Sequence, residues 1–425
     1  MATIEPFKIR DFRLYFFAQA ISLTGSALSP VALTLGILES TNSASTVGYV
    51  LAASVIPTVG FLVFGGVWAD RLPRNLVMVA TNLICALTYL IMGAMFLTGR
   101  FELWVAVVLQ VLTGLSLAFY LPCLAGLTAE TVPPELLQKA NGLLSLVRSA
   151  SGAMGPLLAS LFVMAGTAGA ALCIDGVTFV LSAWLLYRMK VKPRPAEATA
   201  VTHGFVRELV DGFKEVTARN WVWSSIVTFA FAQFASAVFL VLGPFVLKER
   251  GEPAIVWGSA IAALSVGQLI GDFFALRFSP SRPLVAERLV SVLSVPVLLF
   301  LAMDVPSWVI VASAVPAGFA LTFPDALWCT ALQRYLPPNS LSRVTSYDEI
   351  GSRGLRPIGY MSAALIASEI GVVSTLTICA CGILFSKLGS LAFRDVWGVG
   401  HTRAAAPATE AQQADPGLGV SHDAV

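Results

Sequence analysis

Hydrophobic residues run along this chain in twelve long stretches, which short polar segments separate. The stretches cover about 14–38, 46–69, 76–98, 102–127, 141–165, 168–188, 221–247, 254–276, 284–303, 306–332, 345–367 and 370–391. Each approaches the roughly 20 residues that an α-helix needs to cross a bilayer. The stretches are continuously apolar and do not alternate with a period of two, which excludes the strands of a membrane barrel. The pattern predicts an all-α polytopic membrane protein with twelve transmembrane helices.

Basic residues are distributed unequally between the polar segments. If the N-terminus is placed inside, the inner segments hold 21 of the 27 Lys and Arg residues, while the outer loops hold only Arg100, Lys248 and Arg250. Three more, Arg148, Arg353 and Arg356, fall inside apolar stretches. Membrane proteins keep Lys and Arg on the cytoplasmic side. The distribution therefore predicts that both termini are cytoplasmic.

The composition excludes several classes of protein. Of the 425 residues, 56% are hydrophobic and 12% charged, and the mean hydropathy is +0.79. Soluble domains carry about 25% charged residues, and a net charge of +2 argues against a nucleic-acid partner. The six cysteines lie in apolar runs without zinc spacing, so they act as small hydrophobes. The three histidines lie in polar segments and no phosphate-binding loop is present. The sequence predicts neither an enzyme nor a cofactor or metal site.

The polar segments divide the chain into five parts. They are a cytoplasmic N-terminus (1–13), an N-terminal six-helix bundle (14–189), a cytoplasmic linker (190–220), a C-terminal six-helix bundle (221–393) and a tail (394–425). Within the linker, residues 203–219 have apolar positions at helical spacing and predict a surface helix. The tail is rich in Ala, Pro and Gln and is expected to be disordered.

The two bundles share a weak internal repeat. The matches include Gly114 with Gly318 at a shift of 204, Gln19 with Gln233 at a shift of 214, and Asp70 with Asp272 at a shift of 202. They keep chain order and fall at equivalent helix positions. Two six-helix repeats joined by a linker are typical of transporters that bind substrate near the membrane midplane, between the halves. A sensor or an anchor would leave this duplication unexplained.

A charged turn separates the second and third apolar stretches. It reads Gly66-Val-Trp-Ala-Asp70-Arg71-Leu-Pro73-Arg74-Asn75 and resembles the loop signature of the major facilitator superfamily. Pro73 stands where the family usually has Gly, and Asn75 where it often has a basic residue. The resemblance implies that Gly66, Asp70, Arg71 and Arg74 take part in conformational gating.

A second stretch, in the fifth predicted helix, reads Ser151-Gly152-Ala-Met-Gly155-Pro156-Leu-Leu-Ala159-Ser160. It resembles a signature of the exporting, antiporting branch of the superfamily, with small residues replacing three of its glycines. Gly152 and Gly155 allow helices to approach closely, and Pro156 bends the helix. The resemblance implies a role for these residues in conformational change, and ordinary helix packing is the alternative interpretation.

Two further motifs extend the resemblance to nearly the whole chain, residues 8–393. They are Gln138-x-x-Asn141-x-Leu-x-Ser-x-x-Arg148 and Trp328-x-x-Ala331-Leu332-Gln333-Arg334, which are similar to those of bacterial macrolide and siderophore exporters. The resemblance implies a monomeric drug:proton antiporter of the bacterial plasma (inner) membrane, whose partners are protons, lipid and a small amphipathic or apolar substrate. A proton-coupled nutrient importer has the same fold and is the alternative; metal export has no supporting acid- or His-rich segment.

Ionisable residues within the spans are candidates for mechanism, because their burial in lipid is costly. In the family fold the fifth and eighth helices face each other, so we expect Arg148 and Asp272 to form an ion pair that closes the cytoplasmic side. The alternative for Arg148 is snorkelling to the headgroups. As the proposed counterpart of Asp272, Asp70 would face the N-terminus of the eleventh helix, which attracts a carboxylate.

Other candidates are expected to line the cavity, which the family's first, fourth, seventh and tenth helices form. Asp325 lies nine residues before Arg334 in the tenth stretch, and a carboxyl in such a cavity suits proton binding and release. Asp175 is expected to be a structural hydrogen-bonding group. Possible substrate contacts, with helix packing as the alternative, are Gln19, Gln110, Tyr120, Phe229 and Gln233. The expected cavity positions contain no charged cluster, so the sequence does not predict a strongly ionic substrate.

Overall fold

The computed structural model describes residues 2–190, 213–336, 344–345, 347–348, 351–352 and 354–398. Within these ranges, side chains are described except those of residues 2–4, 63–71, 125, 129, 134 and 138. Most of the predicted linker helix, 203–219, therefore lies outside the described residues, although 213–217 are helical.

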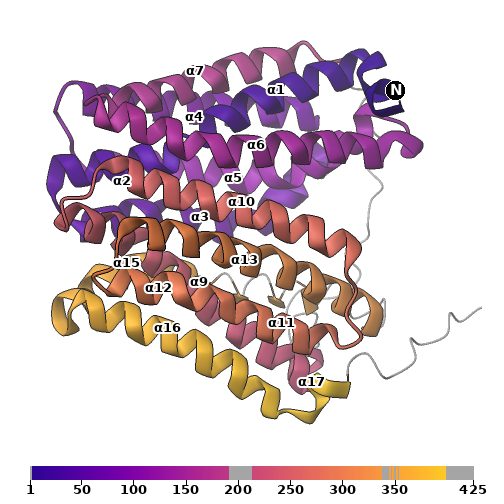
Figure 1. Ribbon diagram of the computed structural model, residues 1–425. Coiled ribbons are helices and arrows are strands. Elements are labelled where there is room, and N and C mark those ends of the chain that lie inside the picture. Colours follow the sequence, from indigo (N-terminus) through magenta and orange to yellow (C-terminus); the bar gives the residue numbers. More distant parts are fainter. Residues whose placement is uncertain are drawn as a thin grey trace, which may run out of the picture.

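The described chain consists of helices and contains no strand (Figure 1). The N-terminal half comprises η1 (Ala2–Lys8), α1 (Arg10–Ser26), α2 (Ser29–Thr41), α3 (Ala44–Arg71), α4 (Arg74–Leu97), α5 (Leu103–Thr131), η2 (Pro134–Leu136), α6 (Leu137–Met164) and α7 (Ala168–Tyr187). The C-terminal half comprises α9 (Asn220–Glu249), α10 (Ala254–Arg277), α11 (Pro283–Ser291), η3 (Val292–Ser294), α12 (Val295–Ala302), α13 (Ser307–Tyr335), α15 (Leu355–Ile370), α16 (Val372–Gly389), η4 (Ser390–Ala392) and α17 (Arg394–Gly398).

Eleven membrane-spanning segments among the described residues are long and apolar enough to cross a bilayer. The first predicted stretch is one such segment, in which α1 and α2 follow each other across a break at Ala27 and Leu28; Pro30 begins the second helix at a position that proline favours. The predicted stretch 345–367 differs, because its described helix, α15, has only 16 residues and part of the stretch is not described. The all-α fold is confirmed, and the count of twelve spans is not.

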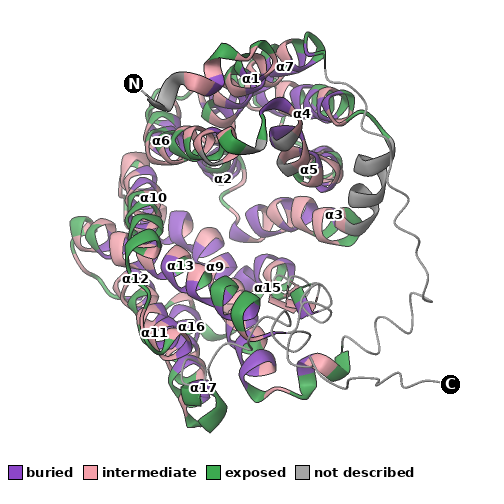
Figure 2. Cartoon of the chain, turned by 90° about the vertical axis from the view of Figure 1, so that its right-hand side faces the viewer, coloured by how far each residue is buried: buried purple, intermediate pink, exposed green. Residues whose placement is uncertain are grey.

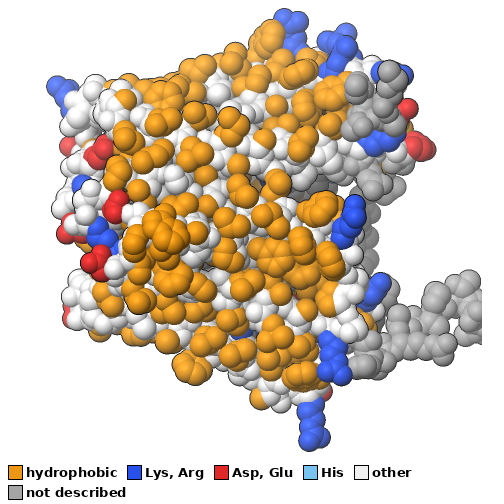
Figure 3. Space-filling model, viewed as in Figure 1, with side chains coloured by type: hydrophobic (Ala, Val, Ile, Leu, Met, Phe, Trp, Pro, Cys, Tyr) orange, Lys and Arg blue, Asp and Glu red, His pale blue; other side chains and the backbone are white. Residues whose placement is uncertain are grey.

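Two ends of the bundle can be distinguished (Figure 1). We call the end that carries the start of α1 and the α3–α4 turn the termini end, and the end that carries the α2–α3 and α9–α10 turns the opposite end. Exposed hydrophobic side chains cover the flank between the two ends, and Lys and Arg side chains border this band at the termini end (Figure 3). Such a surface is suited to a bilayer.

Close backbone approaches support the internal repeat. A Cβ on Gly114 would lie 2.0 Å from the carbonyl oxygen of Ser54, and one on Gly318 would lie 1.9 Å from that of Leu264. The shift of 204 is therefore matched by the same contact in each half. Because Leu264 takes the place of Ser54 at a shift of 210, Asp272 corresponds to Leu62, and the predicted equivalence of Asp70 and Asp272 is wrong.

The halves meet towards the opposite end. The Lys248 ammonium donates a hydrogen bond to the Leu38 carbonyl at 2.6 Å. Gly258 lies so near α6 that a Cβ there would be 1.7 Å from Ser160 Oγ. Towards the termini end, Arg148 of α6 and Asp272 of α10 are exposed. Figure 2 looks onto this end, with the two bundles one above the other, and in Figure 3 the surface is indented between them there.

Two sequence expectations about charged segments need correction. The 21 Lys and Arg residues counted as lying in inner segments include Arg288 and Lys387, but both side chains are buried within the C-terminal half. The tail predicted to be disordered from residue 394 begins with the short helix α17, and its Val396 is fully buried. The rest of the tail lies outside the described residues.

Candidate functional site

A pocket of about 310 Å³ lies in the N-terminal half where α1, α5 and α6 face one another. Its lining combines amide, hydroxyl and guanidinium groups with leucines. The lining residues are Tyr15, Gln19, Leu23, Leu121, Leu124, Thr128, Asn141, Leu144, Ser145 and Arg148. Polar groups that converge on a largely apolar concavity are typical of small-molecule sites. This pocket is therefore the candidate functional site.

Hydrogen bonds fix the orientation of the side chains from α1. The Tyr120 hydroxyl donates to Gln19 Oε1 at 2.9 Å, while the buried Gln19 Nε2 has no partner among the described residues. The Tyr15 hydroxyl donates to the Leu124 carbonyl at 3.1 Å and lies 3.0 Å from Thr128 Oγ1. The amide of Gln19 is thus held with its donor unused. Of the predicted substrate contacts, Gln19 lines the pocket and Tyr120 positions it.

Arg148 brings the only charge to this pocket among the residues that line it. Its side chain is exposed, and within the described part of the chain it forms no ion pair. Asp272, its predicted partner, is exposed as well and is likewise in no ion pair there. The predicted gate is therefore not formed in this conformation, in which the halves meet towards the opposite end.

The remaining predicted cavity residues do not line this pocket. Gln110 is buried in α5, Gln233 is half-buried in α9, and Asp325 is exposed in α13. Phe229 lies elsewhere, with its ring centroid 4.0 Å from Lys387 Nζ and 5.8 Å from the Trp328 ring. The structure thus packs Phe229 inside the C-terminal half.

The α3–α4 turn holds one ion pair that the sequence analysis did not predict. Arg74 Nη1 lies 2.9 Å from Glu130 Oε1, so the start of α4 is tied to the end of α5. The guanidinium packs over Gly126, where a Cβ would lie 2.1 Å from Arg74 Nη1. Three other predicted gating residues, Gly66, Asp70 and Arg71, fall where side chains are not described.

The stretch 151–160 of α6 is a packing segment. Gly155 packs on the break between α1 and α2, since a Cβ there would lie 2.3 Å from Ala27 Cβ. Pro156 and Ser160 face Gly258 of the other half, whereas Gly152 has only ordinary contact with Ser265. The segment therefore joins helices within the N-terminal half and across the interface between the halves. A contact between the halves is where a movement of one half against the other would be felt.

A buried ionic cluster in the C-terminal half was missed by the sequence analysis. Glu287 of α11 pairs with Arg288, and its Oε1 lies 2.5 Å from Lys387 Nζ of α16. Ser291 donates to the same oxygen at 3.1 Å, and Arg288 Nη2 donates to Ser225 Oγ of α9 at 2.7 Å. The three charged side chains are at most 1% exposed.

One carboxylate in this cluster thus faces two cations. Phe229 covers Lys387 with its ring face, a contact that stabilises a cation, but Arg288 Nε has no partner in the described part of the chain. The cluster ties α9, α11 and α16 together. The sequence signal for this cluster is the pair of adjacent charges at 287 and 288, which lie within the predicted apolar stretch 284–303. The count of basic residues treated Arg288 as part of an inner polar segment instead.

Asp175 of α7 is a buried acid of the N-terminal half. It is fully buried and accepts hydrogen bonds from Ser26 at 3.4 Å, Thr178 at 3.3 Å and Ser29. Ser26 and Ser29 flank the break between α1 and α2. Asp175 therefore holds this break to α7, as a structural hydrogen-bonding group.

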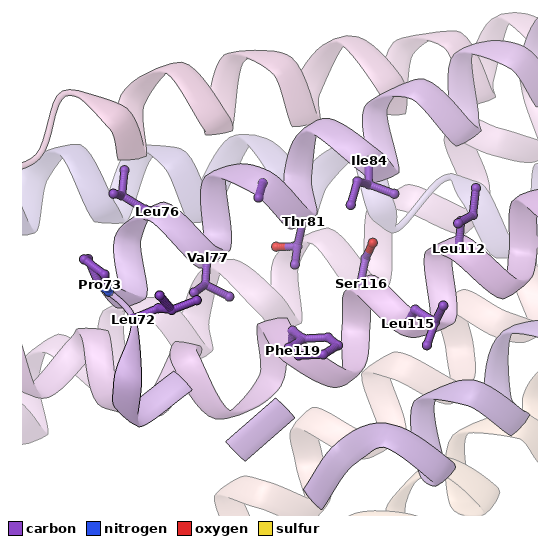
Figure 4. A pocket seen from close by; sticks show the side chains of 11 residues that line it. Leu72, Pro73, Leu76, Val77, Thr81, Ile84, Leu112, Leu115, Ser116 and Phe119 are labelled. Atoms are coloured by element: carbon purple, nitrogen blue, oxygen red, sulfur yellow. The ribbon is translucent and has the colours of Figure 1, made fainter. Parts of the chain in front are cut away.

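A second pocket, of about 410 Å³, lies beside α4 and α5 (Figure 4). Its lining is apolar except for the hydroxyls of Thr81 and Ser116, and it contains no charged or amide side chain. Of these two pockets, only the one that contains Arg148 can recognise a charged group. No cluster of three metal-ligating side chains occurs among the described residues.

Comparison with known proteins finds a family, relatives and solved structures that resemble this chain. The family described as Major Facilitator Superfamily matches residues 15–360. Macrolide efflux protein A of Streptococcus pyogenes is 23% identical over 88% of this chain and 95% of its own length. The multidrug efflux pump Tap of Mycolicibacterium fortuitum is 25% identical over 85% and 90%. The crystal structure of the nucleoside transporter NupG superposes with a TM-score of 0.70 at 13% identity, over 90% of this chain and 98% of that one, which shows a shared fold.

Proposed function

Because this chain belongs to the major facilitator superfamily, we propose that it exports small amphipathic molecules from the cytoplasm by alternating access, driven by protons. The chain is a transporter and not an enzyme, and it acts on a small-molecule substrate. In this proposal it works as a monomer in the bacterial plasma membrane. The termini end is cytoplasmic, as the distribution of Lys and Arg favours.

The observation that carries the proposal is the position of the Arg148 pocket relative to the contacts between the halves. The pocket is lined by the first half of α6, near the termini end, whereas Lys248, Gly258 and their partners join the halves towards the opposite end. A substrate could therefore reach the pocket from the cytoplasm. Rocking of the halves would then open the opposite end and close the first.

Export is favoured over import by the relatives. Two proteins that resemble this chain over most of its length are named for efflux, of macrolides and of multiple drugs. The α6 segment 151–160 forms part of the interface between the halves, which suits its resemblance to the exporter signature. A proton-coupled importer has the same fold and remains the alternative.

Transport in inside-out membrane vesicles tests the direction. Vesicles that contain the protein are expected to accumulate a fluorescent amphipathic drug when their interior is acidified, and a protonophore should abolish the accumulation. Vesicles that lack the protein are the control. Accumulation only in right-side-out vesicles would support the importer instead.

Arg148 and Asp272 are expected to latch the cytoplasmic side in the other conformation. Both groups are exposed at facing helices of the two halves, and in this conformation neither forms an ion pair with a described residue, so an ion pair becomes possible when this end closes. We expect Arg148→Asp and Asp272→Arg each to reduce export at least about tenfold, which corresponds to an interaction of ~1.4 kcal/mol. The combined exchange should recover most of the export of an uncharged amphipathic drug in the vesicle assay. No recovery in the double variant would argue against the latch.

A further inference from the structure

Hydrogen-bond donors and one positive charge dominate the polar part of the Arg148 pocket. Gln19 lines the pocket with its Oε1 occupied by Tyr120, and its buried Nε2 donor has no partner among the described residues. Asn141 and Ser145 of α6 lie beside Arg148 in the lining, and no acidic side chain lines the pocket from α1, α5 or α6. The site therefore offers a cation and donors without a balancing anion.

The charge of Arg148 lies in a membrane-spanning helix without an opposite charge among the described residues. A charged group in such a segment is stabilised by water or by an opposite charge, and Arg148 forms no ion pair in the described part of the chain. The carboxylate of Glu130, in the last turn of α5, is engaged by Arg74. A ligand that carries its own negative charge would supply what the pocket lacks, because a guanidinium binds a carboxylate through two parallel hydrogen bonds.

We propose that this pocket selects amphipathic molecules that carry a carboxylate. The carboxylate binds Arg148 and the Gln19 amide, and the apolar body of the ligand lies against Leu23, Leu121, Leu124 and Leu144. A cationic amphiphile is disfavoured by repulsion from Arg148. The inference rests on the proposed function, since it takes this pocket as a substrate site, and it narrows the substrate from apolar or amphipathic molecules to amphipathic anions.

A pair of probes that differ in one charge tests the selection. Dansyl-leucine carries a carboxylate and its methyl ester does not, and binding of each is measured by fluorescence to the full-length protein in phosphatidylcholine nanodiscs. The wild-type protein should bind the carboxylate at least about tenfold more tightly than the ester, as expected for a charge-assisted hydrogen bond. Arg148→Gln should abolish this preference without changing the affinity for the ester, and Arg148→Lys should retain part of it.

Control variants separate recognition from other roles of Arg148. Arg334→Gln removes another exposed arginine, in α13, and should leave the preference intact. Asp272→Asn removes the proposed latch and should also leave it intact. Adding phosphatidylglycerol to the nanodiscs tests whether an anionic lipid headgroup is the true ligand. We expect no loss of probe affinity that depends on Arg148, and such a loss would assign the site to lipid and overturn the proposal.

The inference fails if the wild-type protein binds both probes equally or if Arg148→Gln keeps the preference. Either result leaves the proposed export function standing, because that function is tested separately by drug accumulation in vesicles. The inference is also overturned if Arg334→Gln loses the preference for the carboxylate probe as fully as Arg148→Gln does. The effect would then reflect the net charge of the protein.

Discussion

Replacement of Glu287 by Gln is expected to destabilise the folded protein by about 3–5 kcal/mol, because it leaves the buried cations of Arg288 and Lys387 without their counter-charge. The glutamine has nearly the same shape, so the loss reports charge and not volume. Thermal unfolding in detergent, followed by size-exclusion chromatography of heated samples, measures the change. We expect a marked fall in the midpoint temperature.

The cluster predicts an asymmetry between its two partners. Lys387→Met removes the second cation and leaves Glu287 paired with Arg288, so no uncompensated charge remains and the expected loss is below about 1.5 kcal/mol. Glu215→Gln, in a part-exposed pair with Arg219, is the matched control and should cost less than about 1 kcal/mol. If Lys387→Met were as damaging as Glu287→Gln, the account of one carboxylate shared by two cations would be wrong.

Asp325→Asn is expected to abolish transport that is driven by a pH gradient while sparing exchange of substrate down its own gradient. Asp325 is the only acidic residue of α13, and its side chain is exposed. It follows Pro324 and lies nine residues before Arg334, near the end of the helix. Asparagine preserves the shape but cannot bind and release a proton, so coupling should be lost without loss of the transport cycle. Accumulation and counterflow in the same vesicles measure the two activities.

A control for this variant is Glu215→Gln, which neutralises a part-exposed acid outside the membrane-spanning segments and should keep both activities. Unaltered uphill accumulation in Asp325→Asn would remove this residue from the coupling mechanism. Loss of counterflow together with accumulation would instead show that Asp325 is needed for the cycle itself.

Much of the architecture could be predicted from hydrophobicity alone. Continuous apolar stretches define their own helices in lipid, because every backbone group must be satisfied within the segment. The break between α1 and α2 was not predicted, since Pro30 lies within a run that stays apolar on both sides. Both repeat matches rested on residue type, and the shift of 204 held because the close backbone contact at Gly114 and Gly318 requires glycine in each half, whereas no such contact links Asp70 with Asp272.

Side-chain partners were much harder to predict. Lys387 lies 100 residues after Glu287, and no local pattern shows that α11 and α16 bring them together. Burial also depends on tertiary packing, which is why Lys387 was taken for a flanking charge. By contrast, Gln19 and Arg148 stood out as polar residues inside apolar stretches, and the structure brings both to one pocket.

The central claim is that the two halves rock about the pocket, opening one end as the other closes. Spin labels on a cysteine-free background at Thr98 and Asp304 report on the opposite end, and labels at Leu72 and Ser281 report on the termini end; all four positions are exposed. Pulsed electron resonance then measures both distances as pH and substrate are varied. The account predicts that one distance lengthens as the other shortens, and distances that stay fixed or change in the same direction would contradict it.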